Sequence, residues 1–249
     1  MNKENLLVLD ADIIPFTVCH NKKDQIYEKT LEECISLADN YIKNIIINTN
    51  SNYFIGFLTR GKCFRYTINP DYKSNSKKLE PLKHSFEVRK YIEKKYKLIS
   101  YKDLYEADDL ILSSLNQLKA NFNCIACSSD KDILKIVNKG YDIKKMSFVE
   151  NTNLEIVENF WKSMIVGDPA DFIKGIPGKG IKYAENLFKE KIKYNNELEY
   201  SELVFSSYLT NLGLKGIDDF YKNYKCLKIL DDIILNNLEI IKTEEILCE

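Results

Sequence analysis

Residues 6–10 read LLVLD, a short apolar run that ends at Asp10. Four apolar residues in a row, closed by an acid, are typical of a strand that is buried on both faces of a parallel sheet. Residues 53–58 and 124–127 repeat the pattern. Because segments with helical spacing lie between these strands, the sequence predicts an α/β fold with a parallel sheet.

The helical patterns define the organisation of the chain. Apolar residues recur at helical spacing over residues 30–48, 82–95 and 106–119. Beyond about residue 150 the strand patterns stop, and helical ones continue to the C-terminus. We therefore expect a core over residues 1–150 and a helical region over residues 151–249.

The composition excludes several classes of protein. The 249 residues are 45% hydrophobic and 29% charged, which is ordinary for a globular protein. No apolar run is long enough to cross a bilayer, and the N-terminus does not resemble a signal peptide. Seven cysteines, an odd number, indicate reduced thiols in a cytoplasmic setting rather than a disulfide framework. With only two histidines, we expect neither a structural zinc site nor a Cys/His catalytic pair.

The net charge of −1 conceals a strong asymmetry. Between Arg60 and Lys102, thirteen lysines and arginines stand against four acids, so this segment carries +9 and the remainder −10. A basic segment beside an acidic remainder suits a protein that grips a polyanion near an acidic, metal-loaded pocket. A solvated, lysine-rich helical face explains the same charges equally well, so charge alone does not decide the function.

Acidic residues follow the predicted strands and open the predicted helices. In open parallel sheets, ligands bind outside the carboxyl ends of the strands. Asp10 ends the first strand, and Asp130 and Asp132 follow a later one. The other candidates begin a helix or lie in the sequence GDPAD, and they are Glu106, Asp108, Asp109, Asp168 and Asp171.

Eight carboxylates in one cleft would repel one another and raise their own pKa values. Divalent cations remove that cost, and oxygen ligands favour Mg²⁺ or Mn²⁺ over zinc. Two such ions about 3.5–4 Å apart activate a water and stabilise the leaving oxygen in phosphoryl displacement. Each group of acids also has a structural explanation, as a helix cap, a favourable first turn or a solvated loop. The hypothesis of a metal centre therefore rests on their combination.

A glycine-rich segment, GIPGKGI at residues 175–181, lies between two helical patterns. Glycines let the backbone approach a ligand closely, and the free amides at a helix start bind phosphate. The segment lacks the Lys and Ser/Thr of a Walker A loop, so we expect no nucleotide cofactor. A plain tight turn is the structural alternative, whereas a grip on duplex backbone agrees with the other features.

Five motifs in this order resemble the 5′→3′ exonuclease and flap endonuclease family, in the style of its compact bacteriophage members. They are VLDAD at residues 8–12, EADD at 106–109, SDKD at 129–132, GDPAD at 167–171 and GIPGKG at 175–180. The resemblance covers about residues 6–188, and the order of the motifs carries it, because each alone is weakly specific. It implies a Rossmann-like (PIN-like) core followed by a helix–three-turn–helix element that binds duplex DNA.

The resemblance also implies which residues hold metal ions. One Mg²⁺ ion, for which Mn²⁺ can substitute, would be held mainly by Asp10, Glu106 and Asp108. A second would be held by Asp130, Asp132, Asp168 and Asp171. Asp109 would act nearby or in the outer shell of these ions.

Further roles for DNA contact follow from the resemblance. In the loop at residues 70–75, Tyr72 would stack on a base and Lys73 would stabilise the developing charge of the phosphate. The basic segment at about residues 70–102, with Lys77 and Lys83, would form an arch for a single-stranded 5′ end. The glycine hairpin would hold duplex backbone, with a K⁺ ion on its carbonyl groups, through Gly175, Ile176, Gly178, Lys179, Gly180 and Lys182.

Two positions depart from the family pattern. Family members carry an Asp after the second strand, where this chain reads Leu58-Thr59-Arg60-Gly61, so the first metal site lacks one ligand. Asp12 either compensates for that loss or is a surface or helix-capping acid. The Arg that usually follows the loop Lys by three residues is replaced by Ser76, with Lys77 and Lys78 beside it.

We therefore expect a monomeric, Mg²⁺-dependent nuclease of the cytoplasm, or of the host cytoplasm if a phage encodes it. It would hydrolyse DNA from or near a 5′ end, at duplex ends, nicks or flaps, without a covalent enzyme intermediate. One rival is a nuclease for RNA in RNA–DNA hybrids, and only the glycine hairpin favours DNA over it. The other rival is a DNA-structure-binding protein that lost activity with the missing Asp, and the retention of all the other acids argues against it.

Overall fold

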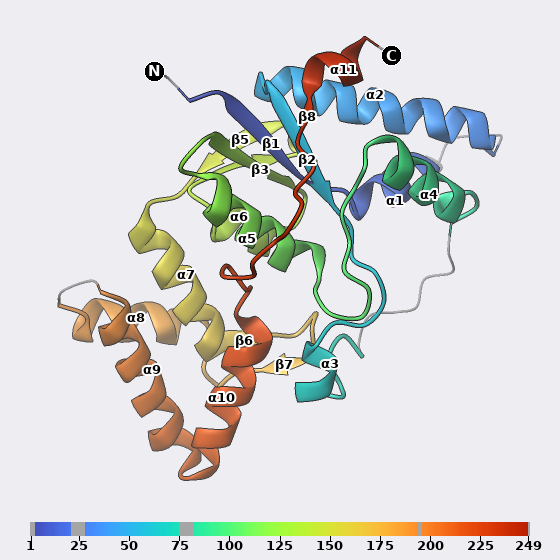
Figure 1. Cartoon of the computed structure of the whole chain (residues 1–249). Helices are drawn as coiled ribbons and strands as arrows, with labels where there is room; N and C mark the ends of the chain where they lie inside the picture. The colour runs from blue at the N-terminus through green and yellow to red at the C-terminus, as the bar shows by residue number, and fades with distance from the viewer. Residues whose placement is uncertain (1–2, 21–27, 75–81, 194–195, 249) are drawn as a thin grey trace. The chain divides into compact units, whose positions relative to one another are not determined.

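The computed structural model describes residues 3–20, 28–74, 82–193 and 196–248. The chain folds into two compact units, whose elements are labelled in Figure 1. The sheet unit comprises Met1–Lys62, Leu79–Glu150 and Leu230–Glu249, and the helical unit comprises Cys63–Lys78 and Asn151–Ile229. All seven cysteines are free, which agrees with the expected reduced thiols.

The sheet unit is built on a six-stranded sheet in the order β5-β4-β3-β1-β2-β8. The four inner strands run parallel, and the two edge strands run antiparallel to their neighbours. The strands are β1 (Asn5–Asp10), β2 (Tyr53–Phe57), β3 (Asn123–Ser128), β4 (Lys139–Asp142), β5 (Ser147–Glu150) and β8 (Ile241–Lys242). The predicted parallel α/β sheet is thus confirmed, and β1 lies at its centre between β2 and β3.

Helices cover both faces of the sheet (Figure 1). Leu7 and Leu9 of β1 pack with α1 (Ile13–Cys19), α2 (Leu31–Thr49) and α4 (Ser85–Lys95) on one face. Leu6 and Val8 pack on the other face with α5 (Ala107–Leu118) and α6 (Lys131–Lys135). Because successive residues of a strand point to opposite faces, four consecutive apolar residues are buried here only by having a helical layer on each side.

The C-terminal segment corrects the predicted division at residue 150. Residues 230–249 belong to the sheet unit, where β8 pairs with β2 and α11 (Thr243–Leu247) places Ile246 in the core. Residues 63–78 belong to the helical unit. We expected only helices between residue 151 and the C-terminus, and this was wrong at Ile241–Lys242, which form the strand β8.

The helical unit packs its helices around an aromatic core that includes Trp161, Phe188, Tyr208 and Phe220. Its elements are α3 (Arg65–Ile68), α7 (Asn153–Val166), β6 (Gly167–Asp168), β7 (Ile173–Lys174), α8 (Ile181–Lys191), α9 (Glu197–Leu212) and α10 (Lys215–Leu227). The buried Arg65 donates to the carbonyl groups of Cys226 and Lys228 at 2.9 and 3.0 Å, which fastens α3 to the end of α10.

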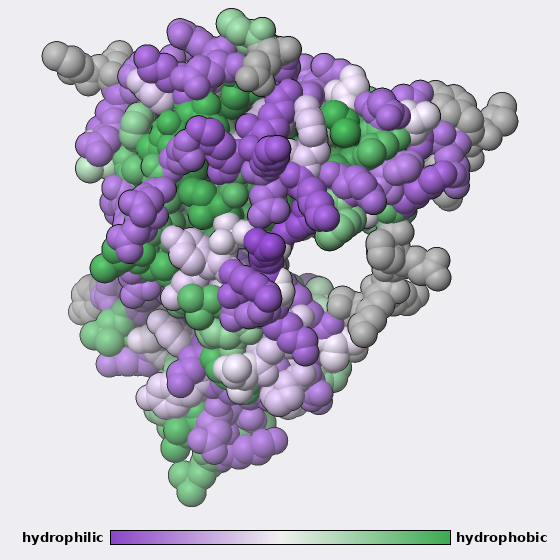
Figure 2. Space-filling model, turned by 45° about the vertical axis from the view of Figure 1, so that its right-hand side comes forward, coloured by the Kyte–Doolittle hydropathy of each residue, from purple (hydrophilic) through white to green (hydrophobic). Residues whose placement is uncertain are grey.

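Hydrophilic residues predominate on the face shown in Figure 2, with apolar patches between them. Among the described residues, no helix has the length and apolar character that a membrane span requires.

Candidate active site

The carboxyl ends of β1, β2 and β3 meet at one edge of the sheet because the three strands run parallel. Asp10 is the last residue of β1, and Ser128 is the last residue of β3. Asp130 follows Ser128 and caps the start of α6, while Glu106 is the residue before α5. The structure thus places the acids of three predicted motifs at this edge or at the helix starts beside it.

Asp10 lies at the centre of this edge and is only 8% exposed. One carboxylate oxygen accepts a hydrogen bond from the Ser128 hydroxyl at 2.7 Å, and the other accepts from the Asp12 amide at 3.2 Å. Burial, aided by the nearby charges of Asp12 and Asp130, raises the pKa of Asp10 to about 7, although the hydrogen bonds from Ser128 and Asp12 act to lower it. The ionised carboxylate is therefore costly here unless a cation accompanies it.

Ser128 is a site residue that the sequence reasoning missed. Its hydroxyl donates to Asp10 and also accepts from the amide of Asp130 at 2.9 Å. One buried hydroxyl thus links the acid that ends β1 to the acid that follows β3. The signal in the sequence is a hydroxyl residue that closes an apolar strand directly before the SDKD motif.

Thr59 lies in the stretch after β2 where the family pattern would place an Asp and this chain has none. Its amide donates to both carboxylate oxygens of Asp12 at 3.1 Å, and its hydroxyl accepts from the Ala107 amide at 2.9 Å. Asp12 also forms an ion pair of 2.9 Å with Arg89 of α4, which donates a second hydrogen bond to the Thr59 carbonyl. Asp12 is therefore bound to an arginine that sequence reasoning did not select, and its side chain does not cap α1.

The EADD motif supplies acids with different surroundings. Glu106 is buried and Asp108 is half-buried. Asp109 is fully buried, and its two oxygens accept from the backbone amides of Leu230 at 2.9 Å and Glu106 at 3.2 Å. These contacts assign Asp109 a structural role, since it joins the start of α5 to the C-terminal segment, and they do not support a metal-binding role for it.

Asp109→Asn is expected to lower the free energy of unfolding by about 1–3 kcal/mol, because an amide can accept only one of the two buried backbone hydrogen bonds. Urea unfolding monitored by circular dichroism measures the change. Asp232→Asn, which alters an exposed acid in the same C-terminal segment, is the matched control and should leave stability unchanged. Equal midpoints for the wild type and Asp109→Asn would contradict the structural role.

Asp130 and Asp132 are exposed. One oxygen of Asp130 accepts from the Asp132 amide at 2.8 Å, and Asp132 forms an exposed ion pair with Lys135 at 3.2 Å. Since surface ion pairs are weak, a stronger cation can displace Lys135 at little cost.

A divalent cation fits this edge for two reasons. The acids offer the oxygen ligands that Mg²⁺ prefers, and the positive charge of the ion would lower the raised pKa of Asp10. As placed, no group of three or more His, Cys, Asp or Glu side chains among the described residues is arranged to hold a metal ion. The carboxylates would have to turn toward an ion on binding it.

Asp168 and Asp171 lie in the helical unit. Asp168 accepts from the amides of Ala170 and Asp171 at 2.8 and 3.4 Å, and Asp171 accepts from the Tyr72 hydroxyl at 2.9 Å. The structural explanation of the acids as helix caps does not hold for Asp168, because β6 and β7 pair across a turn here. Asp168 stabilises that turn instead.

The residues that were predicted to contact DNA from the loop and the arch lie in different surroundings. Tyr72 is only 3% exposed and packs edge to face on Tyr66, so its ring is not placed to stack on a base. The Lys73 ammonium lies 5.1 Å over the Tyr72 ring, and its amide donates to the Asp171 carbonyl at 3.0 Å. Lys83 pairs with Glu28 at 2.6 Å on the surface, while Lys77 lies outside the described residues.

The glycine hairpin joins β7 to α8 in the helical unit. Ile176 is buried and its amide donates to the Ile165 carbonyl at 2.8 Å, which ties the hairpin to α7. Gly178 has a φ of 71°, and open space surrounds both Gly178 and Gly180. Because no side chain caps α8, its first amides are available to a phosphate, with the exposed Lys182 beside them. Lys179 lies over the Tyr183 ring at 4.4 Å.

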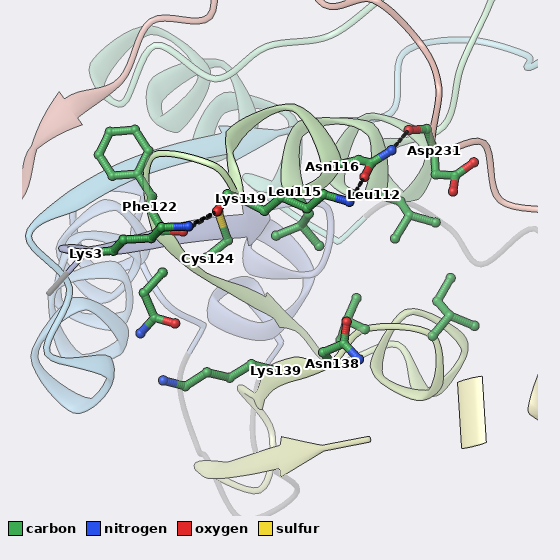
Figure 3. A pocket seen from close by; sticks show the side chains of 13 residues that line it. Lys3, Leu112, Leu115, Asn116, Lys119, Phe122, Cys124, Asn138, Lys139 and Asp231 are labelled. Carbon is green, nitrogen blue, oxygen red and sulfur yellow. Dashed lines mark hydrogen bonds between the residues drawn. The ribbon is translucent and has the colours of Figure 1, made fainter. Parts of the chain in front are cut away.

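A different hollow, of about 810 Å³, lies at the opposite edge of the sheet (Figure 3). Lys3 and Lys139 border it at the starts of β1 and β4, and Leu115 and Phe122 contribute apolar surface. Asp231 is its sole acidic lining residue. A metal centre built from carboxylates therefore belongs to the other edge, which holds Asp10.

Comparison with known proteins agrees with this arrangement. Residues 5–162 match the family model described as the 5′-3′ exonuclease, N-terminal resolvase-like domain. A 5′-3′ exonuclease of Mycoplasmopsis pulmonis is 30% identical over 220 residues, which cover 80% of this chain and 70% of that protein. DNA polymerase I of Caldicellulosiruptor bescii is 27% identical over 77% of this chain, which matches only 25% of that longer protein.

The fold also occurs among solved structures. The bacteriophage T5 flap endonuclease, determined in a complex with DNA and metal ions, superposes with a TM-score of 0.69. The match covers 90% of this chain and 89% of that one at 17% identity. Likeness at this level of identity shows a shared fold.

Proposed function

The chain belongs to the 5′-3′ exonuclease family, and we propose that it hydrolyses DNA phosphodiesters from or near a 5′ end with two bound Mg²⁺ ions. The buried Asp10, whose pKa of about 7 reflects the burial of a carboxyl beside other acids, is the observation that carries the metal dependence. DNA is the proposed substrate because the relatives include DNA polymerase I and the T5 structure contains DNA.

The acids divide between the two proposed ions as the resemblance implies, with one change. Asp10, Glu106 and Asp108 would hold the first ion, and Asp130 and Asp132 would contribute to the second. Asp109 is left out because its oxygens bind backbone amides. When bound, such ions activate water and stabilise the leaving oxygen.

Residues of the chain itself would orient the acids and the substrate. Ser128 holds the Asp10 carboxyl and the turn before Asp130 in a fixed relation. Arg89 holds Asp12 and the end of β2 against α4. Lys73 is proposed to stabilise negative charge on the phosphate, and the amides at the start of α8 to receive the duplex backbone with Lys179 and Lys182.

Asp130→Asn tests the assignment of the carboxylates. It should abolish cleavage of a labelled 5′ flap in Mg²⁺ and leave DNA binding, measured by fluorescence anisotropy, largely intact, because Asp130 is exposed and its loss does not disturb the core. Glu4→Gln removes a carboxylate from the opposite edge of the sheet and should cleave normally. Cleavage by Asp130→Asn at the wild-type rate would show that the assignment is wrong.

A further inference from the structure

The helical unit has an open aromatic groove of about 560 Å³ that the proposed reaction does not use. Helices α7, α9 and α10 line it with the rings of Trp161, Phe205, Phe220, Tyr221 and Tyr224. Tyr221 is 55% exposed, and Leu198 on the rim is 65% exposed. Large apolar side chains that are exposed together mark interaction sites, whereas single ones are ordinary.

The rings hold one another in place. Phe220 packs edge to face on Phe205 with ring centroids 5.1 Å apart, and it stacks on Trp161 at 6.3 Å. Buried Tyr208 supports Phe220 from a third side at 5.5 Å. Because these contacts fix the ring positions before anything binds, an occupant would meet a preformed surface and lose little affinity to ordering it.

Trp161 leaves a hydrogen-bond donor unused. The residue is 2% exposed, and its indole nitrogen has no hydrogen-bond partner in the part of the chain that the structure describes. A buried donor without an acceptor is unfavourable. The nitrogen is buried below the surface that an occupant of the groove would contact, so this donor does not select the partner.

The charge of the groove selects the kind of partner. Glu197 and Glu202 line it, both are exposed, and no Lys or Arg is among the described residues that line it. Neither carboxylate forms an ion pair with any described residue. Two unpaired carboxylates repel a phosphate backbone, so this groove is not an extension of a DNA-binding surface. They attract a lysine or arginine.

We propose that the groove binds a segment of a partner protein that presents a large apolar side chain next to a lysine or arginine. The apolar side chain is buried against the aromatic rings, and the cation pairs with Glu197 and Glu202.

Selection from a phage-displayed library of random dodecapeptides on the whole, immobilised chain tests the proposal. The enriched peptides should combine Lys or Arg with Leu, Phe or Trp. Peptides that lack tryptophan can then be titrated by the fluorescence of Trp161, the single tryptophan of the chain. A saturable shift in its emission is expected.

Two variants test whether the selected peptides bind in the groove. Glu197→Gln/Glu202→Gln should weaken the selected peptides by at least tenfold, as two cation contacts are lost, and should leave flap cleavage unchanged. Glu190→Gln, which alters an exposed acid of α8, should bind like the wild type. The proposal is overturned by selected peptides that lack basic residues, by equal binding to the double variant, or by no enrichment. It is also overturned if sedimentation shows a dimer that the double variant abolishes, since a second copy would then fill the groove.

Discussion

Asp10→Asn is expected to reduce Mg²⁺-dependent cleavage about 10³-fold, the order of effect seen when a charge-stabilising group is removed from an active site. The same change should make the protein more stable in EDTA at pH 8. Asp10 is buried at the edge of the sheet, and its pKa of about 7 lies above its ordinary value of 3.8. The wild type therefore carries an unfavourable buried charge at pH 8, which asparagine removes.

The sign of the pH dependence follows from the raised pKa. The folded protein binds the Asp10 proton more tightly than the unfolded chain does. This proton therefore makes its full contribution to the free energy of unfolding below about pH 4. It is lost as the pH rises through about 7. In EDTA, the advantage of Asp10→Asn in free energy of unfolding should thus grow between pH 4 and pH 8, as urea titrations would measure. A difference between the two proteins that is independent of pH would contradict this account of Asp10, and Glu4→Gln serves as the surface control.

Gly175→Ala is expected to destabilise the helical unit by about 3 kcal/mol, at the upper end of the range for overpacking. A methyl group there would lie 2.2 Å from the Ile165 carbonyl oxygen, 2.4 Å from the Val166 carbonyl carbon and 2.5 Å from the Gly167 nitrogen. All three atoms are backbone, so none can move aside as a flexible side chain does. Duplex DNA binding should weaken with it, because the hairpin and the start of α8 would shift.

Trp161 reports this unfolding, since it lies in α7 of the same unit. Urea unfolding monitored by its fluorescence should show a lower midpoint for Gly175→Ala. Gly180→Ala is the matched control in the same hairpin, because no atom lies within 4 Å of the added methyl group. An unchanged midpoint for Gly175→Ala would mean that the hairpin and α7 do not touch as described.

The features that the sequence predicted are local ones. The strand at LLVLD, the helices over residues 30–48 and 106–119, and the placement of acids at strand ends all follow from short periodic patterns. Parallel strands bring their carboxyl ends together without further information, which is why Asp10 and the SDKD motif could be assigned to one edge. The family order of the motifs added the nuclease activity.

The features that the sequence did not predict depend on distant residues. Asp12 meets Arg89 across 77 positions, and Asp109 meets the Leu230 amide across 121. The strand β8 returns to β2 from the far end of the chain. No local pattern contains such pairings, because each is decided by how the layers pack. Tyr72 is a further example. It was predicted to stack on a base, whereas it is buried in a cluster with the distant residues Ile173 and Cys226.

The most direct test of the central claim is cleavage of a DNA flap and a nicked duplex, each labelled at both ends, in Mg²⁺ and in EDTA. We predict products released from the 5′ side in Mg²⁺ and none in EDTA, with product lengths that distinguish exonucleolytic from flap cutting. Binding of intact DNA without cleavage in both Mg²⁺ and Mn²⁺ would contradict the proposal of a metal-dependent nuclease. It would indicate that the chain, which lacks the family's acid after the second strand, binds DNA structures without cutting them.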